Sequence, residues 1–129
     1  MNISNHILIL LGVLFFFVGT ASGQDFVNHD NFDKKIAKDI VVIEFWVEWN
    51  SSNEFGELIK LKECEKYRVN IGLCNKIQKE YNVMAVPTII VFENGEEKER
   101  FNPNIMFQLE VDKKTIQHSV DTLVLNKFQ

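Results

Sequence analysis

Hydrophobic runs separated by polar turns predict a single α/β domain. Residues 40–47 form a nearly unbroken run of β-branched and aromatic residues, interrupted by Glu44, and predict a central strand covered on both faces. Residues 66–71 predict the next strand. Residues 86–92 predict a strand entered through Pro87, which is tolerated there because the first residue of a strand need not donate a hydrogen bond. These runs supply the core of the predicted sheet.

A hairpin completes this sheet. Asn94 and Gly95 form the Asn-Gly pair typical of a two-residue turn. The partner strand covers residues 97–101, and its charged residues 97–100 fit an edge strand that is protected against further pairing.

Helices are predicted around these strands. The spacing of Phe26, Phe32 and Ile36 indicates a short first helix, capped by Asp30 or Asn31. The resulting order of elements is α-β-α-β-α-β-β-α.

Three later helices complete this order. We expect a second helix from Ser51 or Ser52, a third over residues 73–81 and a last one with Asp112 as its N-cap. Their apolar faces comprise Phe55, Leu58, Ile59 and Leu61, then Leu73, Ile77 and Tyr81, then Ile116, Val120 and Leu123.

The first 23 residues have the composition of a signal peptide. They contain no Asp, Glu, Lys or Arg, and the apolar run of residues 7–18 suits the roughly 7–15 residues of a signal core better than the ~20 of a membrane span. Ala21 and Gly23 are small residues, so cleavage is expected before Gln24, which leaves residues 24–129 as the mature domain. An uncleaved anchor is the alternative, because this segment lacks the usual N-terminal Lys or Arg.

Charge and cysteine content narrow the classes of function. The net charge is −4 and no block of Lys and Arg accompanies aromatic residues, which argues against nucleic acid as a partner. Cys64 and Cys74 are separated by a predicted strand, whose five central residues span about 16 Å, whereas a disulfide tolerates Cα atoms no more than ~7 Å apart. We therefore expect two free thiols. Histidine spacing fits no metal site, and neither a metal nor a cofactor is predicted.

Residues 43–53 and 86–88 carry recognisable motifs. The first reads Ile-Glu-Phe-Trp-Val-Glu-Trp-Asn-Ser-Ser-Asn and the second Val-Pro-Thr. Together they resemble the thioredoxin family, in which a hydrophobic strand leads into Trp-x-x-Trp-Cys-Gly-Pro-Cys and a cis-proline opens a central strand. In this resemblance Trp46 and Trp49 match the two tryptophans, and Asn50 and Asn53 stand at the two cysteine positions. It implies a three-layer α/β/α thioredoxin-like fold with a central mixed sheet, flanking helices and a cis peptide bond at Pro87.

The resemblance also implies a buried pair of charges. Glu44 stands where the family buries an acidic residue in the strand before its active site, and Arg68 matches a basic residue on the neighbouring strand. A buried carboxylate is costly unless it is paired or neutral. We therefore expect a structural pair of Glu44 and Arg68, or a raised pKa at Glu44.

The two asparagines change the available chemistry. An amide forms no thiolate, so disulfide exchange through a dithiol is not expected. The simplest interpretation of Asn50, Ser51 and Ser52 is helix capping, because their side-chain oxygens can accept from the first free N–H groups. The functional interpretation is a kept peptide-facing surface, with extended peptides pairing to the backbone at Val86. Its predicted residues are Trp49, Asn50, Ser51, Ser52, Asn53, Val86 and Pro87.

Two further features leave alternatives open. Cys74 is a candidate reactive thiol at a helix start, although a buried, inert thiol is the commoner situation. The apolar residues 105–109, from Ile105 to Leu109, are core residues by default and a partner surface if several are exposed together. Ser51 or Ser52 is not expected to act as a nucleophile, because no histidine is placed beside them.

These observations predict an exported thioredoxin-fold protein, periplasmic or secreted, that acts as a redox-inactive polypeptide-binding or chaperone-like module. Its expected partners are extended or partly folded polypeptides or another exported protein, with a membrane only if the leader is retained. The alternatives are thiol–disulfide exchange through Cys74 alone and a structural subunit that docks through Ile105 to Leu109.

Overall fold

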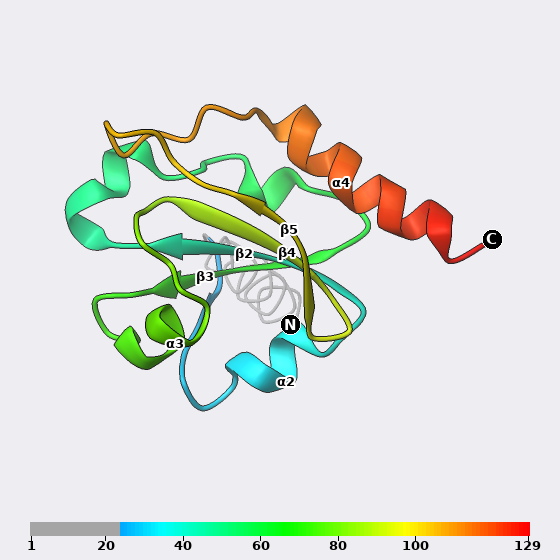
Figure 1. The fold of residues 1–129 in the computed structure, drawn as a ribbon, viewed down its shortest axis with the longest axis horizontal. Helices are drawn as coiled ribbons and strands as arrows, with labels where there is room; N and C mark the ends of the chain where they lie inside the picture. The colour runs from blue at the N-terminus through cyan, green and yellow to red at the C-terminus, as the bar shows by residue number, and fades with distance from the viewer. Residues whose placement is uncertain (1–23) are drawn as a thin grey trace, which may run out of the picture.

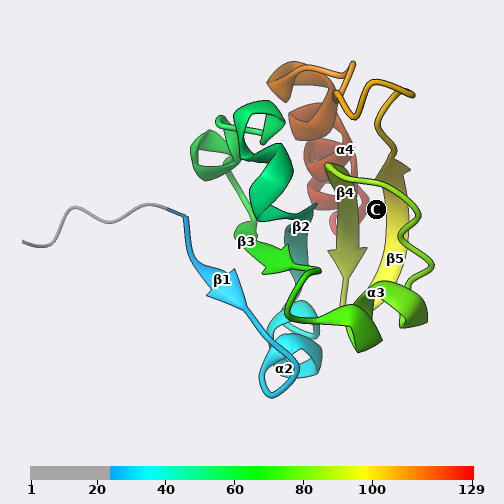
Figure 2. The same ribbon diagram turned by 90° about the vertical axis from the view of Figure 1, so that its left-hand side faces the viewer.

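A mixed five-stranded sheet forms the centre of the molecule in the computed structural model, which describes residues 24–129. The strand order is β1-β3-β2-β4-β5 (Figure 2). Strands β1 and β2 run parallel to β3, whereas β4 is antiparallel to both β2 and β5. The strands comprise β1 Phe26–Val27, β2 Ile40–Trp46, β3 Glu65–Asn70, β4 Thr88–Glu93 and β5 Glu96–Phe101. The predicted leader and its cleavage before Gln24 lie outside the described residues.

Helices cover both faces of this sheet. Helix α4 lies on one face, and α2 and α3 lie on the other (Figure 1). The helical segments comprise α2 Phe32–Ile36, α3 Asn75–Glu80, α4 Lys113–Asn126 and the short 3-10 helices η1 Glu48–Asn53 and η2 Leu58–Lys60. This arrangement confirms the predicted three-layer thioredoxin-like fold.

The alternation of side chains along β2 creates two hydrophobic cores. Ile43 and Phe45 pack with Phe32 of α2 on one face. Val42 packs with Ile116 of α4 on the other face. Because both faces are covered, β2 is buried over nearly its whole length, as its nearly unbroken hydrophobic run predicts.

Several sequence predictions are confirmed. The hairpin turns at Asn94 and Gly95, which both have the positive φ angles that a tight turn requires. Asp112 caps α4, because its carboxylate accepts from the Thr115 N–H at 2.9 Å. The exposed charges of residues 96–99 lie on the edge strand β5.

The predicted first helix is wrong at its start. Phe26 lies in β1, where it is paired with Arg68 of β3, and only Phe32–Ile36 is helical. Pairing with β3 satisfies the backbone of this segment, as in the bond from the Arg68 N–H to the Asp25 carbonyl. Asn31 does not cap α2 with its side chain, which accepts from the Asn28 N–H instead.

The helix predicted from Ser51 or Ser52 is also wrong, because the chain forms only η1 and η2 in this region. Glu54 has an extended backbone, which ends η1. The Phe55 N–H donates to the Glu44 carboxylate, and the Phe55 carbonyl accepts from Arg68. The Glu44 carboxylate thus takes the place of the backbone carbonyl to which the Phe55 N–H would donate in a continuing helix, while the Phe55 carbonyl also accepts from the Leu58 N–H of η2 at 3.2 Å.

The third predicted helix is shorter than expected. Helix α3 begins at Asn75, and Leu73 lies before it with 78% of its surface exposed. Ile77 is buried as predicted, but Leu73 therefore does not belong to the core.

Strand directions bring four loops to one end of the sheet. Strands β2 and β3 are parallel and end there, β4 begins there, and β5 returns to it. Residues 47–57, 71–74, 84–87 and 102–111 therefore lie at the same end (Figure 2). No helix among residues 24–129 is long and apolar enough to cross a membrane.

Candidate functional site

The side chain of Asn50 occupies the centre of this end of the sheet. It is buried, with 8% of its surface exposed. Its Nδ2 donates to the Val86 carbonyl at 3.2 Å and to the Phe107 carbonyl at 3.0 Å. One amide thus ties η1 to the segment before β4 and to the loop before α4. The Val86–Pro87 peptide bond beside it is cis.

Asn53 completes this amide network. Its Nδ2 donates to the Asn50 Oδ1 at 2.8 Å. The capping interpretation is therefore wrong, because the N-terminus of η1 has Val47 at the cap position without a side-chain bond. Ser52 is exposed and Ser51 is partly exposed. The two positions that match cysteines in the resemblance are joined here by a hydrogen bond between amides.

The loop that receives the Asn50 amide is itself tightly ordered. Asn104 accepts through its side chain from the N–H groups of Met106 and Gln108. The Phe107 N–H donates to the Asn104 carbonyl at 3.0 Å. Phe107 has a φ of +58°, a left-handed conformation that an aromatic residue rarely adopts. These bonds and the Asn50 bond hold it in that conformation.

A buried ion pair lies behind the site. Arg68 Nε donates to Glu44 Oε1 at 2.8 Å, and the Phe55 N–H donates to Glu44 Oε2 at 2.8 Å. Arg68 also reaches the partly exposed Glu54 carboxylate at 3.0 Å. Glu44 is fully buried and Arg68 nearly so. The expected structural pair is therefore present.

Burial controls the ionisation of Glu44. Loss of hydration raises the pKa of its carboxyl above the usual value of 4.5, and the Phe55 N–H and the Arg68 guanidinium lower this pKa only in part.

The predicted peptide-facing residues are only partly brought to the surface. Trp49 is 67% exposed, whereas Val86 and Pro87 are buried. The ring of Phe107 packs edge-on against Trp49, with ring centroids 5.4 Å apart. The apolar neighbour of Trp49 is therefore Phe107, and the Val86 carbonyl is already engaged by Asn50.

Exposed apolar side chains lie on the loops at this end of the sheet. The set, named here the apolar rim, comprises Trp49, Leu73, Met84, Ile105, Met106 and Phe107, which are between 41% and 94% exposed. All belong to the loops that converge at this end of the sheet. Leu109, by contrast, packs against the core below α4. Residues 105–107 thus form a surface, and Leu109 anchors it.

Both thiols are free and lie at opposite ends of β3. Burial raises the pKa of Cys64 to about 11, so this thiol stays protonated at neutral pH. Cys74 precedes α3 and is 4% exposed. Only a small part of Cys74 is accessible, which disfavours its attack on another protein's disulfide.

Neither a metal-binding cluster nor a hydrogen bond between histidine and Ser51 or Ser52 is found in the part of the chain that the structure describes. Within residues 24–129, no cluster of three or more His, Cys, Asp or Glu side chains could hold a metal ion. His29 lies near the start of α2 and His118 in α4, and neither forms a hydrogen bond with Ser51 or Ser52 through its side chain.

Sequence reasoning missed Asn104 and Phe107. Phe107 is 57 positions away from Asn50 along the chain, so no local pattern links them. The signal that existed was the apolar run of residues 105–109, whose exposure the sequence left open.

Comparisons with known proteins place these features in a family. A family model described as Thioredoxin matches residues 24–112. Thioredoxin from Mycoplasma genitalium is 36% identical over 70 residues, covering 50% of this chain and 69% of that protein. Thioredoxin from Chlamydia pneumoniae is 30% identical over 80 residues, covering 57% of this chain and 78% of that protein. A solved mutant thioredoxin from Halobacterium salinarum shares the fold with a TM-score of 0.65 and 18% identity, covering 81% of this chain and 96% of that chain.

Replacing Glu44 by Gln is expected to remove a pH dependence of folding. Because the pKa of Glu44 is higher in the folded protein than its usual value of 4.5, the folded state holds this proton more tightly than the unfolded chain does. The free energy of unfolding of the natural protein, relative to Glu44→Gln, should fall as the pH rises from 4.5 through the raised pKa. Urea denaturation of both proteins across this range measures the difference, and a difference independent of pH would contradict the assignment.

Replacing Asn50 by Asp is expected to destabilise the fold by about 2 kcal/mol or more at neutral pH. The new carboxylate oxygen would face the Val86 and Phe107 carbonyls, to which the natural amide donates. Urea denaturation gives the loss, with Ser52→Ala as the control on an exposed neighbour. Equal stabilities of the two variants would show that the Asn50 amide does not hold these loops.

Proposed function

Because the chain belongs to the thioredoxin family, we propose that it is a member in which polypeptide binding has replaced dithiol chemistry. It acts as a redox-inactive, chaperone-like module that holds extended or partly folded polypeptides against the apolar rim. The observation that carries this proposal is the Asn50 amide, which is bonded to Asn53, Val86 and Phe107 at the position of a reactive thiol. This side chain is committed to holding loops together.

The absence of thiols at positions 50 and 53 removes the nucleophile of disulfide exchange. A carboxamide has no ionisable sulfur and forms no mixed disulfide. The two remaining thiols are those of Cys64, which stays protonated, and Cys74, which is buried. These observations support the proposal that the protein does not catalyse disulfide exchange.

The apolar rim supports a binding role. Exposed apolar residues that gather at one end of a protein mark interaction sites more often than scattered ones do. Residues 105–107 stand on a loop that Asn104 and Asn50 hold in place, so little conformational entropy is lost when a partner binds there. We also propose that the protein is exported, because residues 1–23 have the composition of a signal peptide. Export would bring it to unfolded polypeptides outside the cytoplasm. N-terminal sequencing of exported protein decides whether cleavage occurs before Gln24.

Two alternative roles are a structural subunit that uses the same surface and a thiol exchanger that uses Cys74. A structural subunit would dock a folded partner on Ile105 and Met106, whose 94% and 67% exposure favours an interaction. A single-cysteine exchanger would act through Cys74, whose burial argues against it.

The natural protein is expected not to accelerate reduction of insulin disulfides by dithiothreitol. Asn50→Cys combined with Asn53→Cys is expected to create a dithiol that can oxidise, because the natural side chains already meet at 2.8 Å. Insulin turbidity measures the rate, with Cys74→Ser as the control. Activity of the natural protein that is lost in Cys74→Ser would reject the redox-inactive proposal in favour of exchange through Cys74.

Binding of an unfolded polypeptide is expected to depend on the apolar rim. Ile105→Ser combined with Phe107→Ser should weaken the binding of a labelled, permanently unfolded probe protein by roughly tenfold, because two anchors are lost at about 0.7 kcal/mol or more each. Fluorescence anisotropy measures the affinity. Phe128→Ser is the matched control, because Phe128 is 83% exposed but follows the far end of α4.

If the natural protein does not bind unfolded probes, the polypeptide-binding proposal is wrong. If only a folded partner crosslinks to it, and Ile105→Ser abolishes this crosslink, the structural-subunit role replaces it. Equal losses in Phe128→Ser would show that binding is a general property of exposed apolar residues.

A further inference from the structure

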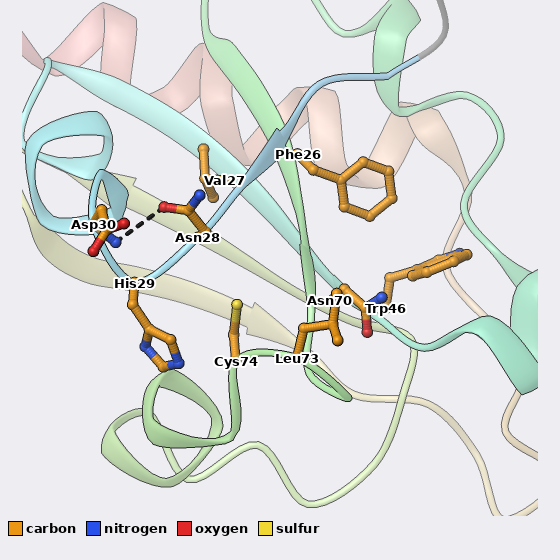
Figure 3. A pocket seen from close by; sticks show the side chains of 9 residues that line it. All are labelled: Phe26, Val27, Asn28, His29, Asp30, Trp46, Asn70, Leu73 and Cys74. Carbon is orange, nitrogen blue, oxygen red and sulfur yellow. Dashed lines mark hydrogen bonds between the residues drawn. The ribbon is translucent and has the colours of Figure 1, made fainter.

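Two hollows adjoin the apolar rim and share a wall. The first, named here the Trp46 hollow, has a volume of about 620 Å³, and its apolar lining includes Phe26, Trp46, Leu73 and Cys74 (Figure 3). The second, named here the Trp49 hollow, has a volume of about 530 Å³ and includes Glu48, Trp49 and Leu73. Leu73 and Asn70 line both. Each volume lies within the roughly 300–1,000 Å³ of ligand pockets.

The two hollows differ in chemistry. Phe26 and Trp46 lie on one side of the Trp46 hollow, and their rings pack edge-on with centroids 5.2 Å apart (Figure 3). Its walls suit a large apolar side chain. The Trp49 hollow instead combines an exposed indole, the stem of Val47 and the exposed carboxylate of Glu48.

The charged side chains differ between the two hollows. Among the residues that the structure describes, no Lys or Arg lines either hollow; His29 and Asp30 line the first, and Glu48 is the only charged residue that lines the second. No salt bridge within residues 24–129 engages Glu48. A cation in the Trp49 hollow would lie beside this carboxylate and the Trp49 indole, and its alkyl stem would lie on Leu73.

The shared wall supplies a polar contact. Asn70 accepts through its Oδ1 from the Gly72 N–H at 2.9 Å, which turns the side chain so that its Nδ2 is the free group. No hydrogen bond from this Nδ2 to another residue of the described part of the chain is present. Because Asn70 lines both hollows, its Nδ2 can donate to a backbone carbonyl of a peptide whose side chains occupy them.

We propose that the two hollows bind one extended polypeptide segment, with a large apolar side chain in the Trp46 hollow and an Arg or Lys side chain in the Trp49 hollow. This assignment rests on the polypeptide-binding function proposed above and names its substrate class: extended segments in which an apolar and a basic residue alternate across one intervening residue. Side chains two positions apart on an extended chain project to the same face about 6.6 Å apart, which suits neighbouring hollows with a common wall.

The test uses short fluorescein-labelled peptides with a Phe-Ser-Arg core in a Gly-Ser frame, together with the reversed core Arg-Ser-Phe. The comparison peptides replace Arg by citrulline, which keeps its shape without the charge, or Phe by Ser. One of the two Arg peptides, Phe-Ser-Arg or Arg-Ser-Phe, should bind about three to ten times more tightly than the same peptide with citrulline, as measured by fluorescence anisotropy. This preference should shrink when the ionic strength is raised, because Glu48 is exposed.

Substitutions in the protein identify the residues that create the preference for the Arg peptide over the citrulline peptide. Glu48→Gln should abolish it, and Glu57→Gln, which removes an exposed carboxylate that lines neither hollow, should leave it intact. Leu73→Ser should weaken the Arg peptide and the citrulline peptide alike, because Leu73 walls both hollows. Leu73 is 78% exposed and Glu48 is exposed, so neither substitution disturbs the core.

The outcomes separate this inference from the proposed function. If unfolded probes bind but Arg and citrulline peptides bind equally, or if Glu48→Gln keeps the preference, the substrate class is wrong and the polypeptide-binding function stands. If neither the probes nor any peptide binds, the proposed function fails as well. Binding of free arginine amide as tightly as the peptide would make the Trp49 hollow a site for small cations and overturn the proposal.

Discussion

The buried contact between Glu44 and Arg68 fixes the architecture of the loop end of the sheet. Each Glu44 oxygen has one donor, Arg68 on one side and the Phe55 N–H on the other, while Arg68 also holds the Phe55 carbonyl. Two desolvated charges of opposite sign require this degree of satisfaction, because either one alone in the core would be strongly unfavourable. The chain after η1 is thereby bound to the centre of the sheet.

That constraint explains how the amide network forms. With Phe55 held at the sheet, the preceding residues turn in the short helix η1, and Asn50 is directed inward. There its amide meets the carbonyls of Val86 and Phe107. The fold of the thioredoxin family is therefore present around Asn50, whose amide acts as a hydrogen-bonded support for the surrounding loops.

The sequence predicted those parts of the molecule that depend on local or periodic patterns. The buried strands follow from hydrophobic runs, the hairpin from Asn94 and Gly95, and the start of α4 from Asp112. The helix expected at Ser51 or Ser52 failed, because the Phe55 N–H donates to the Glu44 carboxylate of β2 and not to a carbonyl of the preceding turn. Hydrophobic spacing carries no record of such long-range polar contacts.

The candidate site was predictable in its position but not in its contacts. The two motifs located the loops, whereas the partners of Asn50 lie 36 and 57 positions away along the chain. Leu73 fits a helical repeat and is nevertheless exposed, because α3 starts only at Asn75. Exposure at a loop end depends on where the neighbouring helix begins, and this is the least certain quantity in a sequence-based assignment.

The backbone of Phe107 bears on how this surface evolves. A left-handed φ of +58° is easy for glycine or asparagine and unfavourable for an aromatic residue, and a partly exposed ring gains little from water exclusion. Neutral drift at this codon would run toward the small residues that relax the backbone. In the proposed binding role, the ring that costs backbone stability also supplies a contact for the partner, so stability and binding place opposite demands on this position.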